Sequence, residues 1–429
     1  MHRQSAGRRR SVAGRGFDLP DERALARRSR QVPAGGGARR LVEEGPRRAL
    51  PGPVGRDGNR GERPARHRAR RGARGGRGYR GRQGLSAFGG RGHREGRVGR
   101  RRIVVAELTY RDAVAAGIAQ EMARDESVVF LGEDIGAAGG VFKTTLGLLE
   151  RFGPRRVRDT PISEQAIIGA AMGAAMTGLR PIAEIMFSDF FAVCWDMIAN
   201  EIAKTRYMTA GQIALPLVIR TANGYGSRFG AQHSQSVENW AMAIPGLKVV
   251  APSTPLDVKG LLAAAVRDPD PVIFFEHKGL YSTKGEVPDG EIVDRLGTAK
   301  VVRQGEDVTI VALAAMVPKS LQAAERLAAE DGISATVVDV RSLVPLDTKT
   351  IFEEVRKTGR LYTVEENPRL CGWGAEIASL VAEECFYDLD GPIVRITTPH
   401  VPLPAADLLE DNAVPTVDRI VETVRRNAG

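Results

Sequence analysis

The sequence predicts an α/β protein with two tandem parallel-sheet domains, preceded by a disordered arginine- and glycine-rich segment. Between residues 104 and 276, short apolar segments typical of buried strands alternate with helical patterns. This alternation is typical of a parallel sheet that is covered by helices on both faces. After a polar, glycine-containing stretch, the same alternation starts again at Asp307 with DVTIVAL, which indicates a second domain of the same class.

The expected elements follow one another as strands and helices in both domains. Thr109 is placed to cap a helix over 109–124, and a short buried strand follows at 127–131. In the rest of the first domain we expect helices over 145–152, 164–178, 191–208 and 255–267, and strands over 180–185, 216–220, 248–251 and 271–276. In the second domain we expect strands over 307–313, 336–339 and 360–365, and helices over 318–330, 348–358 and 374–386. The domains are therefore predicted to span 103–281 and 304–429, with 282–303 as a linker.

The positive charge of the chain is concentrated in its first 100 residues. This segment holds 28 arginines, no lysine, 22 glycines and eight acidic residues, whereas the other 329 residues carry 34 basic and 44 acidic side chains. The net charge of +10 is thus the sum of a +20 segment and a −10 body. Because so few aliphatic side chains cannot offset the entropy of an ordered chain, we expect residues 1–102 to be disordered.

Three interpretations of this segment stay open. An arginine–glycine arm can bind RNA through phosphate contacts and stacking. An arginine-rich, acid-poor leader is typical of an organelle presequence. The absence of lysine favours a third interpretation, in which GC-rich codons upstream of the true start are read as protein and the natural chain begins near 103–105. Nucleic acid is not an expected partner of the acidic body.

Cysteine and apolar patterning disfavour several classes of protein. Cys194, Cys371 and Cys385 form no Cys-x-x-Cys pair, so neither a disulfide framework nor a zinc ribbon is supported, and a cytoplasmic location is expected. The longest apolar run, 166–179, is too short for a membrane span. No apolar region of a secretory signal follows the basic residues 1–10. The sequence also lacks a P-loop, a Gly-x-Ser-x-Gly elbow and a His-Glu-x-x-His motif.

Glu164 is the first candidate for chemistry. It follows Ser163, an expected N-cap, so one interpretation is a carboxylate that interacts with the helix dipole. The next turns, AIIGAAMGAAMTG, contain almost no polar side chains, which indicates that part of the helix is tightly packed. A carboxylate at the start of such a helix is also suited to exchange a proton with a ligand.

His233 is the second candidate. It lies in Gly230-Ala-Gln-His-Ser-Gln235, after the glycine-containing loop NGYGSRFG. A loop histidine between Gln and Ser is poor core material, so a functional role and a surface role both stay open. The glycines of this loop do not match dinucleotide-binding spacing, which disfavours a nicotinamide site. Since a lone Glu and a lone His do not make an enzyme, either the chain is a binding module or another chain completes the site.

Five motifs occur in order in the chain: Asp159-Thr-Pro-Ile-Ser-Glu164, Gly178-Leu-Arg-Pro, 231–235, 245–250 and 267–271. Over about 104–424 the chain resembles the beta subunit of the thiamine-diphosphate-dependent decarboxylating component of 2-oxo acid dehydrogenase complexes. The segments FFEHK (274–278) and KGEVP (284–288) are most similar to the acetoin and pyruvate branches. The resemblance implies a pyrimidine-binding domain followed by a transketolase C-terminal-like domain.

The resemblance also implies a site shared between chains. An alpha subunit, in an alpha2-beta2 heterotetramer, would hold Mg²⁺ and the diphosphate of thiamine diphosphate. Glu164 would hydrogen-bond a nitrogen of the aminopyrimidine and so promote proton loss from the thiazolium carbon, with Ile162 and Phe190 beside it. His233 would serve the transfer of the acyl group to a lipoyl arm of an acyltransferase partner. The expected substrate is a small 2-oxo acid such as pyruvate, or acetoin.

The family further implies a structural potassium ion bound mostly by backbone oxygens. Asp270 stands where an Asn is common, which could alter the preference for the cation. The loop NGYGSRF (223–229) is also bulkier than is often seen in the family. The implied potassium ligands are Leu217, Ala265, Val266, Asp268 and Asp270.

Two other functions stay open beside the dehydrogenase. Half of a split transketolase-like carbon–carbon transferase would share both domains and the pyrimidine-binding Glu164. RNA binding through the arginine–glycine segment, 1–102, would be a function independent of the two domains.

Overall fold

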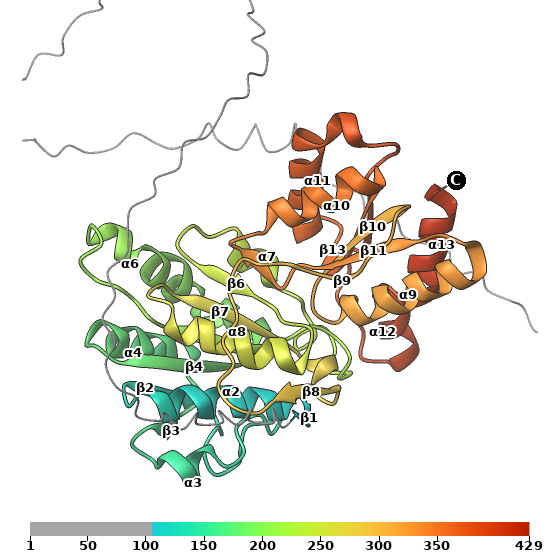
Figure 1. Ribbon diagram of the computed structural model, residues 1–429. Coiled ribbons are helices and arrows are strands. Elements are labelled where there is room, and N and C mark those ends of the chain that lie inside the picture. Colours follow the sequence, from blue (N-terminus) through green and yellow to red (C-terminus); the bar gives the residue numbers. More distant parts are fainter. Residues whose placement is uncertain (1–104, 429) are drawn as a thin grey trace, which may run out of the picture. The chain divides into compact units, whose positions relative to one another are not determined.

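The computed structural model describes residues 105–428, which form two α/β domains (Figure 1). The predicted arginine–glycine segment, 1–102, lies outside the described residues, so its three interpretations stay predictions. Each domain holds a sheet whose strands are parallel except for one edge strand, which confirms the predicted fold class. Within residues 105–428, no helix is both long enough and apolar enough to cross a bilayer.

The first domain is built on a sheet with the strand order β12, β6, β7, β5, β4, β2 and β3. Successive side chains of β7 alternate between two apolar clusters: Val272 and Phe274 pack in one, and Ile273 and Phe275 in the other. Helices α2 (Tyr110–Arg124) and α8 (Pro255–Arg267) contribute to the first cluster, and α4 (Glu164–Met176) and α5 (Phe191–Asp196) to the second. Helices therefore cover both faces, as predicted. The parallel strands are β2 (Val128–Gly132), β3 (Val157–Asp159), β4 (Arg180–Phe187), β5 (Val218–Asn223), β6 (Lys248–Val250) and β7 (Val272–His277).

The second domain repeats this architecture with the strand order β14, β13, β10, β11 and β9. Helices α9 (Met316–Asp331) and α13 (Val417–Ala428) share one apolar cluster with its strands, whereas α10 (Thr348–Thr358) and α11 (Trp373–Glu384) share the other. The edge strand β9 is antiparallel to β11. The strands are β9 (Lys300–Arg303), β10 (Val308–Ala312), β11 (Ala335–Asp339), β13 (Leu361–Pro368) and β14 (Val394–Thr398).

The predicted linker, 282–303, contains two strands. β8 (Lys284–Pro288) pairs with β1 (Val105–Thr109) in a two-stranded antiparallel sheet beside the first domain, and β9 belongs to the second sheet. The connection between strands is therefore shorter than predicted. In addition, β12 (Ser342–Val344) leaves the second domain and pairs with β6, so residues from beyond the connection complete the first sheet.

Two predicted helices differ from the observed ones. Helix α3 begins at Leu148 rather than 145, because Gly147 before it has a left-handed backbone with φ of 79°. The helix predicted over 191–208 is interrupted by a π-helical turn at Met197–Ile202 between α5 and α6 (Ala203–Met208). The predicted cap of α2 is confirmed, since the Thr109 hydroxyl accepts a hydrogen bond from the Asp112 N–H at 3.2 Å.

Candidate active site

Glu164 begins α4 at the carboxyl edge of the first sheet, directly after the turn that follows β3. Its side chain is 8% exposed, and within residues 105–428 its carboxylate forms neither a hydrogen bond nor an ion pair. A largely buried carboxylate without a protein partner is available to bind a ligand. By contrast, Ile162 in the preceding turn is 83% exposed, so an apolar side chain projects beside this carboxylate's helix.

A second carboxylate, Glu133, lies close to Glu164. It follows β2 in the sequence Gly-Glu-Asp and is buried, and the backbone N–H of Ser163 favours its charged form. Burial and the charge of Glu164 raise the pKa of Glu133. Ser163 stands at the N-cap of α4 as predicted, but its side chain makes no capping hydrogen bond. We did not predict Glu133 from the sequence, although an acidic side chain at the carboxyl end of a parallel strand is a usable signal.

Phe190 and His233, which are 43 residues apart in the sequence, lie side by side. Their ring centroids are 5.2 Å apart, and both rings pack edge-on against Phe187 at the end of β4, at 5.9 and 4.8 Å. Glu164 is near the same aromatic cluster: burial and then its charge raise the pKa of the Cys194 thiol to about 12, and that thiol lies 3.7 Å from the Phe190 carbonyl oxygen. The predicted site residues therefore gather at one edge of the first sheet.

The loop that carries His233 is held at its end by Asp189. One carboxylate oxygen of Asp189 accepts hydrogen bonds from both the backbone N–H and the side-chain amide of Gln235, at 3.1 and 2.9 Å. At the start of the loop Gly224 has φ of +82°, and a Cβ there would lie 2.2 Å from the His277 ring. Only glycine fits at that position.

The second domain supports this loop. Glu366 of β13 accepts hydrogen bonds from the backbone N–H of Tyr225 at 3.2 Å and from the His277 ring at 2.5 Å. Asn367 donates to the Ser236 carbonyl oxygen at 2.8 Å. A cavity of about 370 Å³ opens beside the loop and is lined by residues of both domains, among them Gln235, Glu366 and His400.

Arg228 anchors the tip of the same loop to α12 (Asp407–Ala413) of the second domain. Its guanidinium pairs with the buried Glu410 at 2.5 Å and with Asp411 at 2.8 Å. We expect Arg228→Ala to free this loop, because Glu410 loses its ion pair and the tip loses its anchor. Limited proteolysis should then cleave within 224–231 about tenfold faster than in the wild type. Arg425→Ala, which removes exposed ion pairs to Glu330 and Asp331 in the second domain, is the matched control; equal cleavage rates in both variants would contradict the anchoring role.

Comparison with known proteins assigns both domains. The family "Transketolase, pyrimidine binding domain" matches residues 106–284, and "Transketolase, C-terminal domain" matches residues 297–420. The acetoin:2,6-dichlorophenolindophenol oxidoreductase subunit beta of Bacillus subtilis (strain 168) is 49% identical over 327 residues, which cover 73% of this chain and 95% of the relative. The pyruvate dehydrogenase E1 component subunit beta-2 of Oryza sativa subsp. japonica is 47% identical over 75% of this chain and 86% of its own length.

The chain belongs to this family of dehydrogenase E1 beta subunits. The 2-oxoisovalerate dehydrogenase subunit beta of Bacillus subtilis (strain 168) is 46% identical and is covered over 98% of its length. Among solved structures, one described as "Split gene transketolase, inactive beta4 tetramer" has a TM-score of 0.62 and 27% identity, and the match covers 75% of this chain and 98% of that one. The resemblance inferred from the five motifs is thereby confirmed.

The E1 beta-subunit family depends on thiamine diphosphate, and the residues at the carboxyl edge fit the pyrimidine half of that cofactor. Glu164 offers a buried carboxylate without a partner in the described chain, and the exposed Ile162 and half-buried Phe190 offer apolar surface for a flat ring. Within residues 105–428, no group of three or more acidic, His or Cys side chains is arranged for a metal ion.

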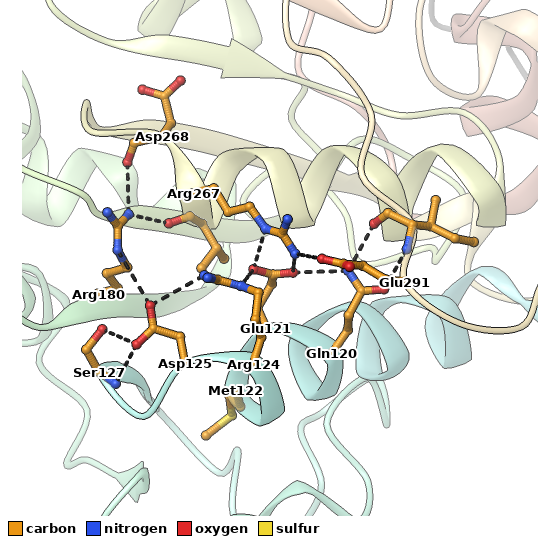
Figure 2. A network of polar contacts seen from close by, with 12 residues as sticks. Gln120, Glu121, Met122, Arg124, Asp125, Ser127, Arg180, Arg267, Asp268 and Glu291 are labelled. Carbon is orange, nitrogen blue, oxygen red and sulfur yellow. Dashed lines mark hydrogen bonds and ion pairs between the residues drawn. The ribbon is translucent and has the colours of Figure 1, made fainter. Parts of the chain in front are cut away.

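The residues predicted to bind potassium lie at the opposite, amino edge of the first sheet, before β5 and β7, and Figure 2 shows one of them, Asp268. Arg180, at the start of β4, donates to the carbonyl oxygens of Val266 and Asp268 at 2.9 and 3.4 Å. Lys248 pairs with the carboxylates of Asp268 and Asp270 at 2.6 and 3.2 Å. Two predicted carbonyl ligands and both carboxylates therefore already interact with cationic side chains, and the potassium ion stays a prediction for these residues and for Leu217 and Ala265.

The same edge carries an ion-pair network that joins α2 to α8 (Figure 2). The carboxylate of Glu121 is fully buried and accepts hydrogen bonds from Arg124 at 2.8 Å and from Arg267 at 2.8 and 2.9 Å. Although burial disfavours its charge, hydrogen bonds from Arg267, Gln120 and Arg124 lower the pKa of Glu121. This network braces the two helices far from the carboxyl edge, so we assign it to stability rather than to chemistry.

Proposed function

We propose that the chain is the beta half of an E1 component that works with an alpha subunit in an alpha2-beta2 heterotetramer. The complex would oxidatively decarboxylate a 2-oxo acid of the pyruvate type, or cleave acetoin, and acylate lipoyl groups on an acyltransferase partner. The observation that carries this proposal is the buried Glu164 carboxylate, which has no partner within 105–428 and lies on the same sheet edge as Phe190 and His233. The acetoin and pyruvate relatives support the choice of substrate.

Glu164 would hold a proton at a nitrogen of the aminopyrimidine. Its side chain is largely buried at the start of α4, and a ring bound there would shield the carboxylate further from water, so this hydrogen bond would be strong. Thiamine diphosphate, when bound, supplies the electron sink that decarboxylation requires. Phe190 and Ile162 would pack against the ring and orient it, while the alpha subunit would hold Mg²⁺ and the diphosphate.

His233 would act at the second stage, where the acyl group passes to the lipoyl arm and a thiolate must take up a proton. We expect His233→Gln to lower the rate of lipoyl acylation about 100-fold. Oxidation of the substrate by the dye 2,6-dichlorophenolindophenol, which bypasses the lipoyl arm, should fall much less. Equal losses in the two assays would remove His233 from the acyl transfer step.

An alpha partner is further supported by the outer face of α4. Along this helix Ala166, Ala170 and Met176 are exposed, and a Cβ added at Gly173 would meet no atom within 4 Å. A helix of small residues that leaves this face uncovered is suited to the close approach of another chain. We also place the complex in the cytoplasm, in keeping with the three free cysteines.

The test combines the full chain with a cognate alpha subunit. Thiamine diphosphate should bind the mixture more tightly than it binds alpha alone, and the mixture should reduce the dye with pyruvate or acetoin. Binding that is no tighter than to alpha alone would contradict the shared site. Because the chain also resembles a split transketolase, a ketol-transfer assay is run in parallel; ketol transfer without lipoyl acylation would favour that alternative.

A further inference from the structure

A buried lysine lies directly behind the aromatic cluster of the site. Lys278 follows β7, begins the short 3-10 turn Lys278–Leu280, and is 4% exposed. Its ammonium group has no hydrogen-bond partner within residues 105–428, and it lies 5.6 Å from the centroid of the Phe187 ring. A buried ammonium group without a hydrogen bond is costly, so its presence here requires a reason other than packing.

The charges around Lys278 come from four elements. Burial lowers the pKa of Lys278 to about 8, and this shift is opposed by Asp189 first and then by Glu366, Glu410 and Glu238. These carboxylates belong to the turn after β4, to β13, to α12 and to α7 (Glu238–Met242). The neighbouring His277 is already engaged with Glu366. Among these carboxylates Asp189 favours the charged form of Lys278 most, although no direct ion pair joins the two side chains within residues 105–428.

Asp189 connects this lysine to the loop that carries His233. One oxygen of Asp189 accepts both hydrogen bonds from Gln235, whereas the other oxygen is buried and has no partner within 105–428. The Phe187 ring contacts the lysine on one side and the His233 ring on another, at 4.8 Å between centroids. Lys278 can therefore influence segment 233–235 in two ways: through the charge of Asp189, which binds Gln235, and through the Phe187 ring, which contacts His233.

We propose that Lys278 is a positioning residue for acyl transfer: its buried ammonium group, which lies beside the Phe187 ring and within the electrostatic influence of Asp189, fixes segment 233–235 and thereby orients His233. This inference rests on the proposed function of His233. Lys278 itself touches neither substrate nor cofactor. Its charge acts by restraining the Asp189 carboxylate, which in turn holds Gln235.

The test uses Lys278→Met in the complete heterotetramer. The ratio of lipoyl acylation to dye reduction should fall at least about tenfold, since a small misplacement of a reacting group is costly. Lys278→Arg, which keeps the charge, should recover most of the ratio.

The ratio of lipoyl acylation to dye reduction in the wild type should decline as the pH rises above 8, where Lys278 loses its proton, whereas the decline should be absent in Lys278→Arg. Lys278→Met should also raise the melting temperature, because it removes a buried charge without a hydrogen bond.

A lysine in another part of the first domain provides the matched control. Lys259 of α8 is also buried, and its ammonium group donates to the Gly290 carbonyl oxygen at 2.9 Å. Lys259→Met should leave the acylation ratio unchanged. If Lys278→Met also leaves it unchanged, or if Lys278→Met lowers the melting temperature and both rates in parallel, the positioning role is wrong and Lys278 is merely structural.

A measurement independent of activity separates this inference from the proposed function. If the wild-type tetramer shows no substrate-dependent dye reduction, the proposed function fails, but hydrogen exchange still tests the restraint. The Gln235 amide, which donates to Asp189, should exchange faster in Lys278→Met than in wild type or Lys259→Met. Asp189→Asn, used where Lys278→Met does not assemble, should give the same increase. An unchanged exchange rate in these variants would overturn the inference.

Discussion

Replacement of Glu164 by glutamine is expected to lower turnover of the assembled enzyme about 100-fold or more, while thiamine diphosphate still binds. Glutamine keeps the size of the side chain but cannot hold an exchangeable proton at the aminopyrimidine nitrogen. Because the carboxylate has no partner within 105–428, its loss breaks no internal contact, so the fold should persist. The measurement is the rate of dye reduction with saturating cofactor, together with cofactor affinity by calorimetry.

Glu150→Gln is the matched control for this result. Glu150 lies in α3 on an exposed surface, so its replacement should change neither turnover nor cofactor affinity. If Glu164→Gln retained full decarboxylation, Glu164 would have no part in the proton exchange. If it lost cofactor binding and turnover in the same proportion, its role would be binding alone.

Replacement of Arg220 by methionine is expected to cost about 3–5 kcal/mol of the free energy of unfolding. Arg220 of β5 is 2% exposed and pairs with two buried carboxylates, Glu184 and Glu276. It donates to Glu276 at 2.6 and 2.7 Å and to Thr144 at 3.1 Å. Methionine fills the space but leaves two buried negative charges side by side.

The loss of unfolding free energy in Arg220→Met should grow as the pH rises. Burial raises the pKa of Glu184 to about 7, above its ordinary value of 4.5, so the folded state binds the proton more tightly than the unfolded state. The stability from that protonation is present at low pH and is lost as the pH rises toward 7. The deficit of Arg220→Met should therefore be larger at pH 8 than at pH 5 in urea denaturation.

The matched control for Arg220→Met is a variant at an exposed arginine. Arg326→Met removes exposed ion pairs with Glu330 and Asp418 and should cost less than about 1 kcal/mol. Adding Glu184→Gln to Arg220→Met should recover part of the loss, because one uncompensated charge disappears. A deficit for Arg220→Met of the same size as for Arg326→Met would show that the buried cluster contributes nothing measurable.

The parts of the fold that could be predicted from the sequence are those with a local signal. The buried strands of the first sheet are short apolar runs, and Thr109 caps its helix as its side chain predicts. By contrast, β8 and β9 fell within a predicted linker because KGEVP and KVVR have no strong apolar alternation. They are strands because each finds a partner, β1 and β11 respectively. Pairing of that kind depends on tertiary context and not on propensity.

The residues of the candidate site also divide into those with a signal in the sequence and those without one. Glu164, Ile162 and His233 could be named because motifs carry them and Phe190 because of the family resemblance, but their proximity could not be derived from spacing. Three buried charged residues near the site could not be identified from the sequence: Glu133, Lys278 and Glu366. In the sequence they are ordinary charged residues, and only their burial beside other charges makes them unusual. No local pattern encodes that burial, since each group meets its neighbours across distant segments.

The contacts of Glu366 and Asn367 with segment 225–236 have a consequence for how such subunits diverge. Each domain has its own sheet, and the two could have been exchanged between relatives by recombination at the connection near residue 290. However, the loop that presents His233 takes its hydrogen bonds from the second domain, and β12 of that domain completes the first sheet. A recombinant that joined unmatched halves would lose these hydrogen bonds and misplace the histidine, so the two domains would have to be inherited together.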